Sequence, residues 1–268
     1  MKVFALADPH LSLATPNKSQ EKFGPQWLDH ARSIGERWRA AVGEDDLVLV
    51  AGDISWAMRL ENAQADLDFL AALPGTKVLI HGNHDYWWSS ISKVRRALRP
   101  RMYALQHDAI RIGTVAVCGT RLWDVPGVNF PDLVDWQPQV VAQGVAATPD
   151  HGRAAQEATE SEKIYRRELD RLRMALAALN QIAPPGNTDG RLRIVMTHYP
   201  PCDANLNPTE VTQLFEQAAI DHAVFGHLHS LRRGLTPPPF GYRHPTHYHL
   251  TACDYLDFTP KLIATAAM

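Results

Sequence analysis

The chain has 268 residues, 45% of them hydrophobic and 21% charged, and its formal net charge at pH 7 is -2. These values are ordinary for a globular protein, and the near-neutral charge argues against a nucleic-acid partner. No apolar stretch approaches the roughly 18 residues of a membrane-spanning helix, so we expect no association with a membrane. Three dispersed cysteines in no CxxC pattern favour a reducing compartment, and we expect a cytoplasmic protein.

Six short apolar segments predict buried strands, because each is rich in Val, Ile and Leu and ends in polar residues or glycine. In chain order they are KVFALAD ending at Asp8, DLVLVAGD ending at Asp53, TKVLIHGNHD ending near Asn83, TVAVCGT ending near Gly119, RLRIVMTH ending at His198 and HAVFGHLH ending at His227. The first of these segments is too short for a signal peptide.

Helical periodicity separates the predicted strands. Apolar residues recur at steps of three and four from Trp27 to Val42, which predicts one helix. Further helices are expected over residues 61–73, 89–98 and about 154–183. Alternating strands and helices predict βαβ units, and so a sheet with helices on its faces. We expect a single domain over residues 1–268.

Two stretches show no clean periodicity and are expected to be loops, residues 121–152 and residues 232–248. A connection as long as the first is functional or disordered in most compact domains. We expect a cap or insertion at about residues 121–183.

The polar residues that could carry chemistry stand where the predicted strands end. They are Asp8, His10, Asp53, Asn83, His84, Asp85, His198, His227 and His229. Oxygen and imidazole donors without cysteine suit borderline divalent ions such as Mn, Fe or Zn. The set is too large for one catalytic ion, whereas two ions that share a carboxylate would use it economically.

The order of these residues resembles that of the calcineurin-like metallophosphoesterases. The matching blocks are Asp8-x-His10, Gly52-Asp53, Gly82-Asn83-His84-Asp85, His198 and Gly226-His227-x-His229. The resemblance implies an α/β protein with a four-layer α/β/β/α sandwich and a dinuclear metal site at one edge of its sheets.

The resemblance also implies a role for each residue. The implied ligand sets are Asp8, His10 and His229 for the first metal, Asn83, His198 and His227 for the second, and Asp53 as a bridge. His84 is implied to contact the substrate phosphate or the leaving oxygen. Asp85 is the candidate to orient the imidazole of His84, since carboxylates commonly orient functional histidines.

The expected reaction is hydrolysis of a phosphoester. Two cations lower the pKa of a bridging water, and the resulting hydroxide attacks phosphorus in line with the leaving group. His84 assists the leaving group, and general acid help of this kind is worth about 10²–10⁴-fold.

Departures from known subgroups narrow the class. GDISWAM and HGNHD replace the GDxVDRG and RGNHE of the protein Ser/Thr phosphatases. The lipid-precursor hydrolases commonly have Arg where this chain has His84. The expectation is a bacterial-type phosphohydrolase of a small-molecule phosphomonoester or phosphodiester, with nucleotides among the candidates. The alternatives are a binding or scaffold module without turnover and a nuclease.

Several residues near the motifs have two interpretations. Trp56, Tyr86, Arg121 and Trp123 are candidates for substrate contact, with packing or solvated surface as the alternative. His244, His247 and His249 form a loose cluster, interpreted as a loop edge beside the active site or as an extra metal site. His222 has no motif and is expected to be a surface or core residue.

Overall fold

The computed structural model describes residues 1–130, 132–134, 151–186, 191–232, 234–236 and 238–267, with residues 151–158 described as helix backbone alone. Its first sheet has the strand order β11-β1-β2-β3-β4. The strands are β1 (Lys2–Leu6), β2 (Leu47–Ala51), β3 (Thr76–Ile80), β4 (Met102–Ala104) and β11 (Lys261–Thr265). All neighbours in this sheet are parallel except β11, which runs antiparallel to β1.

The second sheet has the order β5-β6-β7-β8-β10-β9. Its strands are β5 (Asp108–Ile112), β6 (Val115–Thr120), β7 (Leu192–Thr197), β8 (His222–Phe225), β9 (Gly241–Arg243) and β10 (Thr246–Leu250). The four inner strands are parallel, and β5 and β9 are antiparallel edges.

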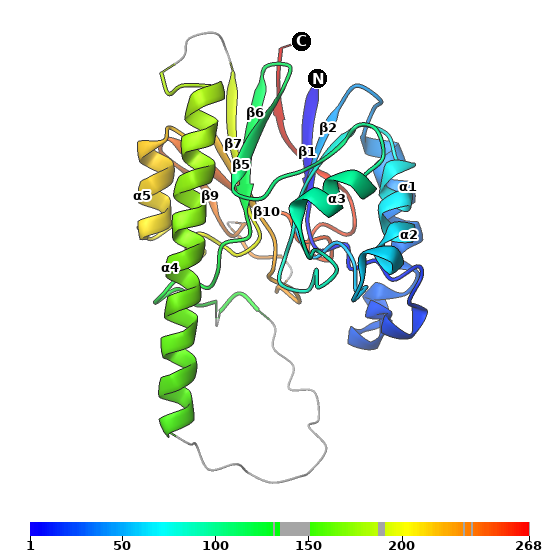
Figure 1. Ribbon diagram of the computed structural model, residues 1–268, viewed down its shortest axis with the longest axis horizontal. Coiled ribbons are helices and arrows are strands. Elements are labelled where there is room, and N and C mark those ends of the chain that lie inside the picture. Colours follow the sequence, from blue (N-terminus) through cyan, green and yellow to red (C-terminus); the bar gives the residue numbers. More distant parts are fainter. Residues whose placement is uncertain (131, 135–150, 187–190, 233, 237, 268) are drawn as a thin grey trace.

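Helices cover the outer face of each sheet (Figure 1). The first sheet packs against α1 (His30–Ala41), α2 (Leu60–Ala71) and α3 (Ile91–Ala97), which form one hydrophobic core with it. The second sheet packs against α4 (His151–Ile182) and α5 (Glu210–Gln217) in another core. A third core lies between the sheets. The four-layer α/β/β/α sandwich expected from the sequence is therefore confirmed.

The sequence of β2 shows why the strands of the two sheets form the inner layers of the sandwich. All five residues of LVLVA are buried. Leu47 and Leu49 face the core between the sheets, whereas Val48 and Val50 face the helices. A strand covered on both faces is apolar throughout, because neither face contacts water. Each Val or Leu side chain that is fully buried in this way stabilises the fold by about 1.5–3 kcal/mol.

The predicted helices are confirmed, with small differences at their ends. The one predicted from Trp27 begins at His30, because Trp27 lies in a separate 3-10 turn, Pro25–Trp27. The longest helix begins at His151, inside the stretch expected to be a loop. Figure 1 shows the N-terminal half of α4 projecting beyond the sheets. Half of the expected loop, residues 135–150, lies outside the described residues, as does residue 131.

The prediction of a loop over residues 232–248 is wrong for its second half. Residues 241–243 form β9, and β10 begins at Thr246 and pairs with β8 inside the sheet. Thr246, Tyr248 and Leu250 are buried on alternate positions, with an exposed histidine between the first two. This alternation of buried and polar residues is that of a strand, but prolines and glycines before it obscured the pattern.

Candidate metal centre

The proposed ligands lie at the carboxyl ends of β1, β2, β3, β7 and β8, from both sheets. Parallel strands present these ends at a common edge, so residues far apart in sequence meet there. The donor atoms of Asp8, His10 and His229 lie within 4.8 Å of one another, and so do those of Asp8, Asp53 and His198. The structure thus brings the predicted set together.

The backbone at this edge is strained. Asp8, His10, Asp53 and His227 have positive φ values of 58°, 43°, 51° and 70°. Residues other than glycine rarely adopt positive φ values, and each residue held there by its surroundings costs about 1–3 kcal/mol. Hydrogen bonds from Asp8 N to Gly52 O at 2.9 Å and from His10 N to Asp53 O at 3.0 Å hold the turns. Strain of this kind is typical of functional sites.

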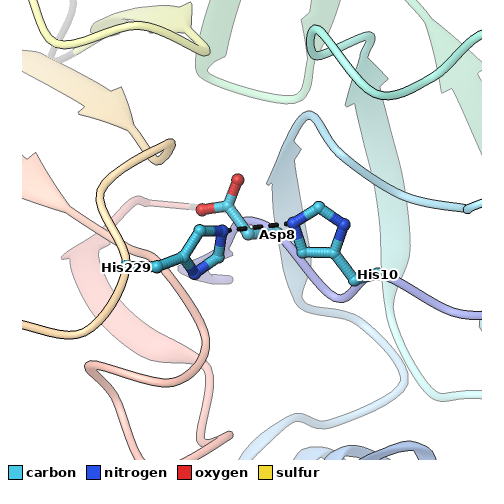
Figure 2. Close-up of side chains that lie close together, drawn as sticks. All are labelled: Asp8, His10 and His229. Atoms are coloured by element: carbon cyan, nitrogen blue, oxygen red, sulfur yellow. Dashed lines mark hydrogen bonds between the residues drawn. The ribbon is translucent and has the colours of Figure 1, made fainter. Parts of the chain in front are cut away.

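The first ligand set consists of Asp8, His10 and His229 (Figure 2). Nε2 of His10 lies 3.1 Å from Nε2 of His229. On the other side of the ring, Nδ1 of His229 forms a 3.0 Å hydrogen bond with Oδ1 of Asp254. That contact fixes the ring and leaves Nε2 directed at the site.

The second set consists of Asn83, His198 and His227. Oδ1 of Asn83 lies 2.7 Å from Nε2 of His198 and 3.0 Å from Nδ1 of His227. Nδ1 of His198 faces the carbonyl oxygen of Ala51 at 3.0 Å. Nδ1 therefore carries the proton, and the lone pair of Nε2 points into the site.

Asp53 lies between the two sets. Its Oδ2 is 3.6 Å from Nε2 of His10 and 3.5 Å from Nε2 of His198. Its Oδ1 accepts a 2.8 Å hydrogen bond from the backbone N–H of His84. One carboxylate oxygen thus faces imidazoles of both sets at nearly equal distances.

Burial dominates the electrostatics of the centre. It lowers the pKa of His198 and His227 to about 3 and that of His10 well below its usual value, which keeps these imidazoles neutral. Burial also raises the pKa of Asp8 and Asp53. Neutral imidazoles and buried carboxylates are suited to divalent ions, whose charge would stabilise the carboxylates. The residues present therefore fit the metal ions expected from the sequence.

His229 is the exception among the histidines. Burial opposes its protonation, but the hydrogen bond to Asp254 and the nearby carboxylate of Asp8 raise its pKa to about 9. The same hydrogen bond lowers the pKa of Asp254 against the effect of burial. In the metal-free chain this pair carries opposite charges at neutral pH.

The expected hydrogen bond between Asp85 and His84 is absent. The Asp85 carboxylate accepts hydrogen bonds from the backbone N–H groups of Ile54, Ser55 and Gly82 and from Nε1 of Trp87. Nδ1 of His84 has no hydrogen-bond partner among the described residues. Asp85 fastens the turn after β3 to the turn after β2, because backbone N–H groups surround its carboxylate. The prediction that it orients the imidazole of His84 is wrong.

The aromatic residues after Asp85 divide into two groups. Trp87 and Trp88 are buried in the core beneath α1, α2 and α3. Tyr86 is 57% exposed, and its ring lies 6.3 Å from that of His84. Trp56 lies against the centre: its ring is stacked on that of His10, with centroids 4.8 Å apart, and tilted against that of His84, with centroids 4.6 Å apart. Tyr86 and Trp56 are thus placed beside His84, and the two buried tryptophans anchor its loop.

Arg121 and Trp123 lie on the opposite side of the centre. The Arg121 guanidinium lies 4.8 Å above the Trp123 ring and donates to Oε1 of Glu168 at 3.1 Å. Trp123 is 5.0 Å from Tyr199, and Tyr199 is 4.1 Å from His227. A continuous row of rings therefore connects Trp123 to the second ligand set.

A family model described as calcineurin-like phosphoesterase matches residues 1–231. The chain belongs to this family. The phosphoesterase is thus a metal-dependent hydrolase that acts on phosphoester bonds, as the order of its motifs predicted. Its groups of Asp and His residues could hold the metal ions.

Individual relatives are more distant. The Gene 66 protein of Mycobacterium phage D29 is 37% identical over 86 residues, which are 31% of the phosphoesterase and 40% of the phage protein. The match therefore spans less than half of that relative. Two solved structures are similar to most of the chain: AQ665 from Aquifex aeolicus, a protein of unknown function (14% identity, TM-score 0.44, 97% of this chain and 94% of that chain), and the phosphopantetheinyl hydrolase PptH from Mycobacterium tuberculosis (13% identity, TM-score 0.46, 92% and 87%).

Two residues of the centre were not found from the sequence. Asp254 follows β10, a strand that was not predicted, and so its place at a strand end was hidden. Tyr199 directly follows His198 and is 4% exposed.

In the part of the phosphoesterase that the structure describes, no helix has the length and apolar composition needed to cross a membrane.

Proposed function

We propose that the phosphoesterase uses a dinuclear centre to hydrolyse small-molecule phosphomonoesters or phosphodiesters, with nucleotides among the candidate substrates. The position of Asp53 carries this proposal. Its Oδ2 faces both imidazole sets at 3.5 and 3.6 Å, the arrangement expected of a carboxylate that bridges two ions. Asp8, His10 and His229 would hold one ion, and Asn83, His198 and His227 the other. Mn, Fe and Zn all suit this donor set.

When bound, the ions supply Lewis acidity toward the phosphoryl oxygens and lower the pKa of water. The chain itself orients the ligands. Asp254 fixes His229, and the carbonyl of Ala51 fixes His198. These contacts hold the imidazole nitrogens in place before substrate arrives, so less reorganisation is needed during the reaction.

His84 is proposed to protonate the leaving oxygen. Its backbone is held by Asp53, and its ring lies against Trp56 with Nδ1 unpartnered among the described residues. A ring held by its backbone and by a tilted aromatic neighbour can still donate a proton to a group that enters the site. This position fits general acid help to the departing alkoxide.

The substrate is proposed to lie between two aromatic walls. Trp56 and Tyr86 stand on the side of His84, and Trp123 stands beyond Tyr199 on the other side. Arg121 supplies a cation beside Trp123, and guanidinium groups bind phosphate oxygens well. We further propose that residues 121–183 act as a cap, since α4 projects beyond the sheets (Figure 1).

The test measures turnover of p-nitrophenyl phosphate and bis-p-nitrophenyl phosphate with added Mn²⁺. The wild type should hydrolyse at least one of them, and Asp53→Asn should lower kcat by 10²-fold or more because both ions lose a ligand. Asp45→Asn, at an exposed carboxylate before the amino end of β2, is the matched control and should retain turnover. If metal-loaded wild type turned over neither compound, nor a wider panel of phosphoesters, the binding or scaffold function would replace this proposal.

A further inference from the structure

Three histidines gather on one face of the second sheet, away from the proposed dinuclear centre. In the parallel pairing of β8 with β10, His247 lies directly beside His222. His249 is two residues further along β10 and so points to the same face. The sequence separates His222 from the other two by more than twenty positions, and only the strand pairing brings them together.

This cluster begins at His222 and His247, near the ends of their strands that lie away from the dinuclear centre, and extends along β10 to His249, which pairs with Val224. His222 begins β8, whereas His227 follows the carboxyl end of the same strand. Five residues of extended chain span about 16 Å at roughly 3.3 Å per residue. The cluster is therefore a separate place on the molecule, and the expectation that His247 and His249 lie at a loop edge beside the active site is wrong.

The ring positions match the needs of a metal ion. Nδ1 of His222 lies 3.0 Å from Nε2 of His249. Two nitrogens bound to one tetrahedral zinc ion, each about 2.0–2.1 Å from it, are roughly 3.3 Å apart. The His247 ring centroid is 5.5 Å from that of His222 and 6.1 Å from that of His249. His247 is exposed and its ring is stacked on that of His222, so rotation of its side chain would bring a third nitrogen toward the other two.

The protonation of the cluster favours ligation. Burial, and then the charge of Lys261, lower the pKa of His249 to about 3. Burial also lowers the pKa of His222. Neutral imidazoles have the free lone pair that a metal requires, whereas Lys261 is a positive charge that counts against a cation. The charge of Asp221 raises the pKa of His222, against the effect of burial.

We propose that His222, His247 and His249 form a second, independent site for a divalent ion of the zinc, copper and nickel class. A residue pair at i and i+2 on one strand with a third imidazole on the neighbouring strand gives three ligands on one side of an ion. A fourth position stays open to solvent, as in zinc sites with three histidines. Imidazoles alone, without carboxylates, select this class over Mg²⁺ and Ca²⁺.

The experiment measures zinc per chain after equilibrium dialysis of the full-length protein against micromolar Zn²⁺. Wild type should hold one more ion than each of His247→Ala, His222→Gln and His249→Gln. His244→Ala is the matched control, because His244 is in the same hairpin but outside the set, and it should hold as much zinc as wild type. His247 is exposed, so its alanine variant should fold, and glutamine at the half-buried His222 and His249 keeps much of the side-chain volume.

The difference between wild type and His247→Ala does not depend on how many ions the Asp53 centre holds. Repeating both measurements in an Asp53→Asn background should give the same difference of one ion, so this inference can fail or hold whatever becomes of the proposed function. Equal zinc content in wild type and His247→Ala would overturn it. Loss of the ion in His244→Ala as well would overturn it too, since the three named ligands would then not define the site.

Discussion

Asp254 makes its contribution through another residue. Its Oδ1 lies 3.0 Å from Nδ1 of His229, and its Oδ2 accepts a 2.9 Å hydrogen bond from the backbone N–H of Ser230. The carboxylate is thus attached to the loop that carries His229, and it fixes both the position and the tautomer of the ring. Residues of this kind set the affinity of a metal site without touching the ion.

Asp254→Asn should weaken metal binding about 10–100-fold, because the amide can no longer hold the Nδ1 proton of His229 as strongly. Titration of the metal-free protein with Mn²⁺, followed by calorimetry, measures the change. Asp257→Asn, three residues along the chain, is the control and should leave the affinity as in wild type. Unchanged affinity in Asp254→Asn would mean that His229 is not a ligand or needs no fixing.

His84→Ala should lower kcat by about 10²–10⁴-fold while the metal content stays as in wild type, since the ring assists the leaving group and binds no ion. Single-substrate kinetics and elemental analysis on the same sample give both quantities. The effect should shrink for an ester whose leaving group needs no proton, such as p-nitrophenyl phosphate compared with an alkyl phosphate. Loss of metal from the variant would instead make His84 a ligand.

At the scale of elements, the turn after β3 explains why one prediction from the sequence was correct and another was wrong. Asn83 was predicted to reach the site because the carboxyl ends of parallel strands meet at one edge, and it does. Asp85 was predicted to orient His84 because carboxylates commonly orient functional histidines. In a tight turn, however, the nearest polar groups to a short carboxylate are backbone N–H groups, and these occupy it.

Periodicity explains which elements could be predicted. The covered strands are rich in Val, Ile, Leu and Ala, and each was predicted: β1, β2, β3, β6, β7 and β8. The hairpin of β9 and β10 lies in a stretch rich in proline, and its polar alternate positions are histidines. Its pairing is set by contact with β8, a tertiary property that no local pattern carries. Asp254 and the His222 cluster both depend on that strand, and so both were missed.

Lys77 on β3 shows how burial alters an element's response to pH. It is 2% exposed, and its Nζ donates to the carbonyl of Leu73 just after α2. Burial, followed by the charge of Arg101, lowers its pKa from 10.5 to about 8. Between pH 8 and 10.5 the unfolded chain binds more protons at this position than the folded one, so this group makes the free energy of unfolding rise with pH.

Lys77→Met should remove that rise. The free energy of unfolding of the variant minus that of wild type should therefore decrease as the pH goes from 8 to 10. Urea unfolding at several pH values measures the difference, and common contributions from other groups cancel in it. Lys93→Met, on the exposed side of α3, is the control and should show a flat difference. A flat difference for Lys77→Met would show that its ammonium is solvated in the folded protein.

At the scale of the whole molecule, the proposed centre connects the two sheets. Asp8, Asp53 and Asn83 come from the first sheet, whereas His198, His227 and His229 come from the second. Ions held there would bind the folded protein and not the unfolded chain. The free energy of unfolding then rises by RT ln(1 + [L]/Kd), about 2.7 kcal/mol for each ion at 100 times its Kd.

Chelation of both ions should lower Tm by about 11–22 °C, because two ions at about 2.7 kcal/mol each shift Tm by roughly 2–4 °C per kcal/mol for a chain of this size. Differential scanning calorimetry with and without EDTA measures this shift, and added Mn²⁺ should reverse it. Asp53→Asn should start from a lower Tm and respond less to EDTA, because its ions are already weakly held. The same response to EDTA in variant and wild type would place the stabilising ions elsewhere.

The stacking of Trp56 on His10 also gives the centre an optical signal. Indole emission depends on the charge and electronic structure of what lies in van der Waals contact with the ring, and His10 is such a neighbour at 4.8 Å. The Trp27 ring also lies beside a ligand histidine, edge-on to His229 with centroids 5.6 Å apart. An ion that takes up these imidazoles changes the emission of both tryptophans, and an open-shell ion such as Mn²⁺ or Cu²⁺ quenches it. The protein therefore carries an intrinsic reporter, so occupancy can be followed in real time without any label.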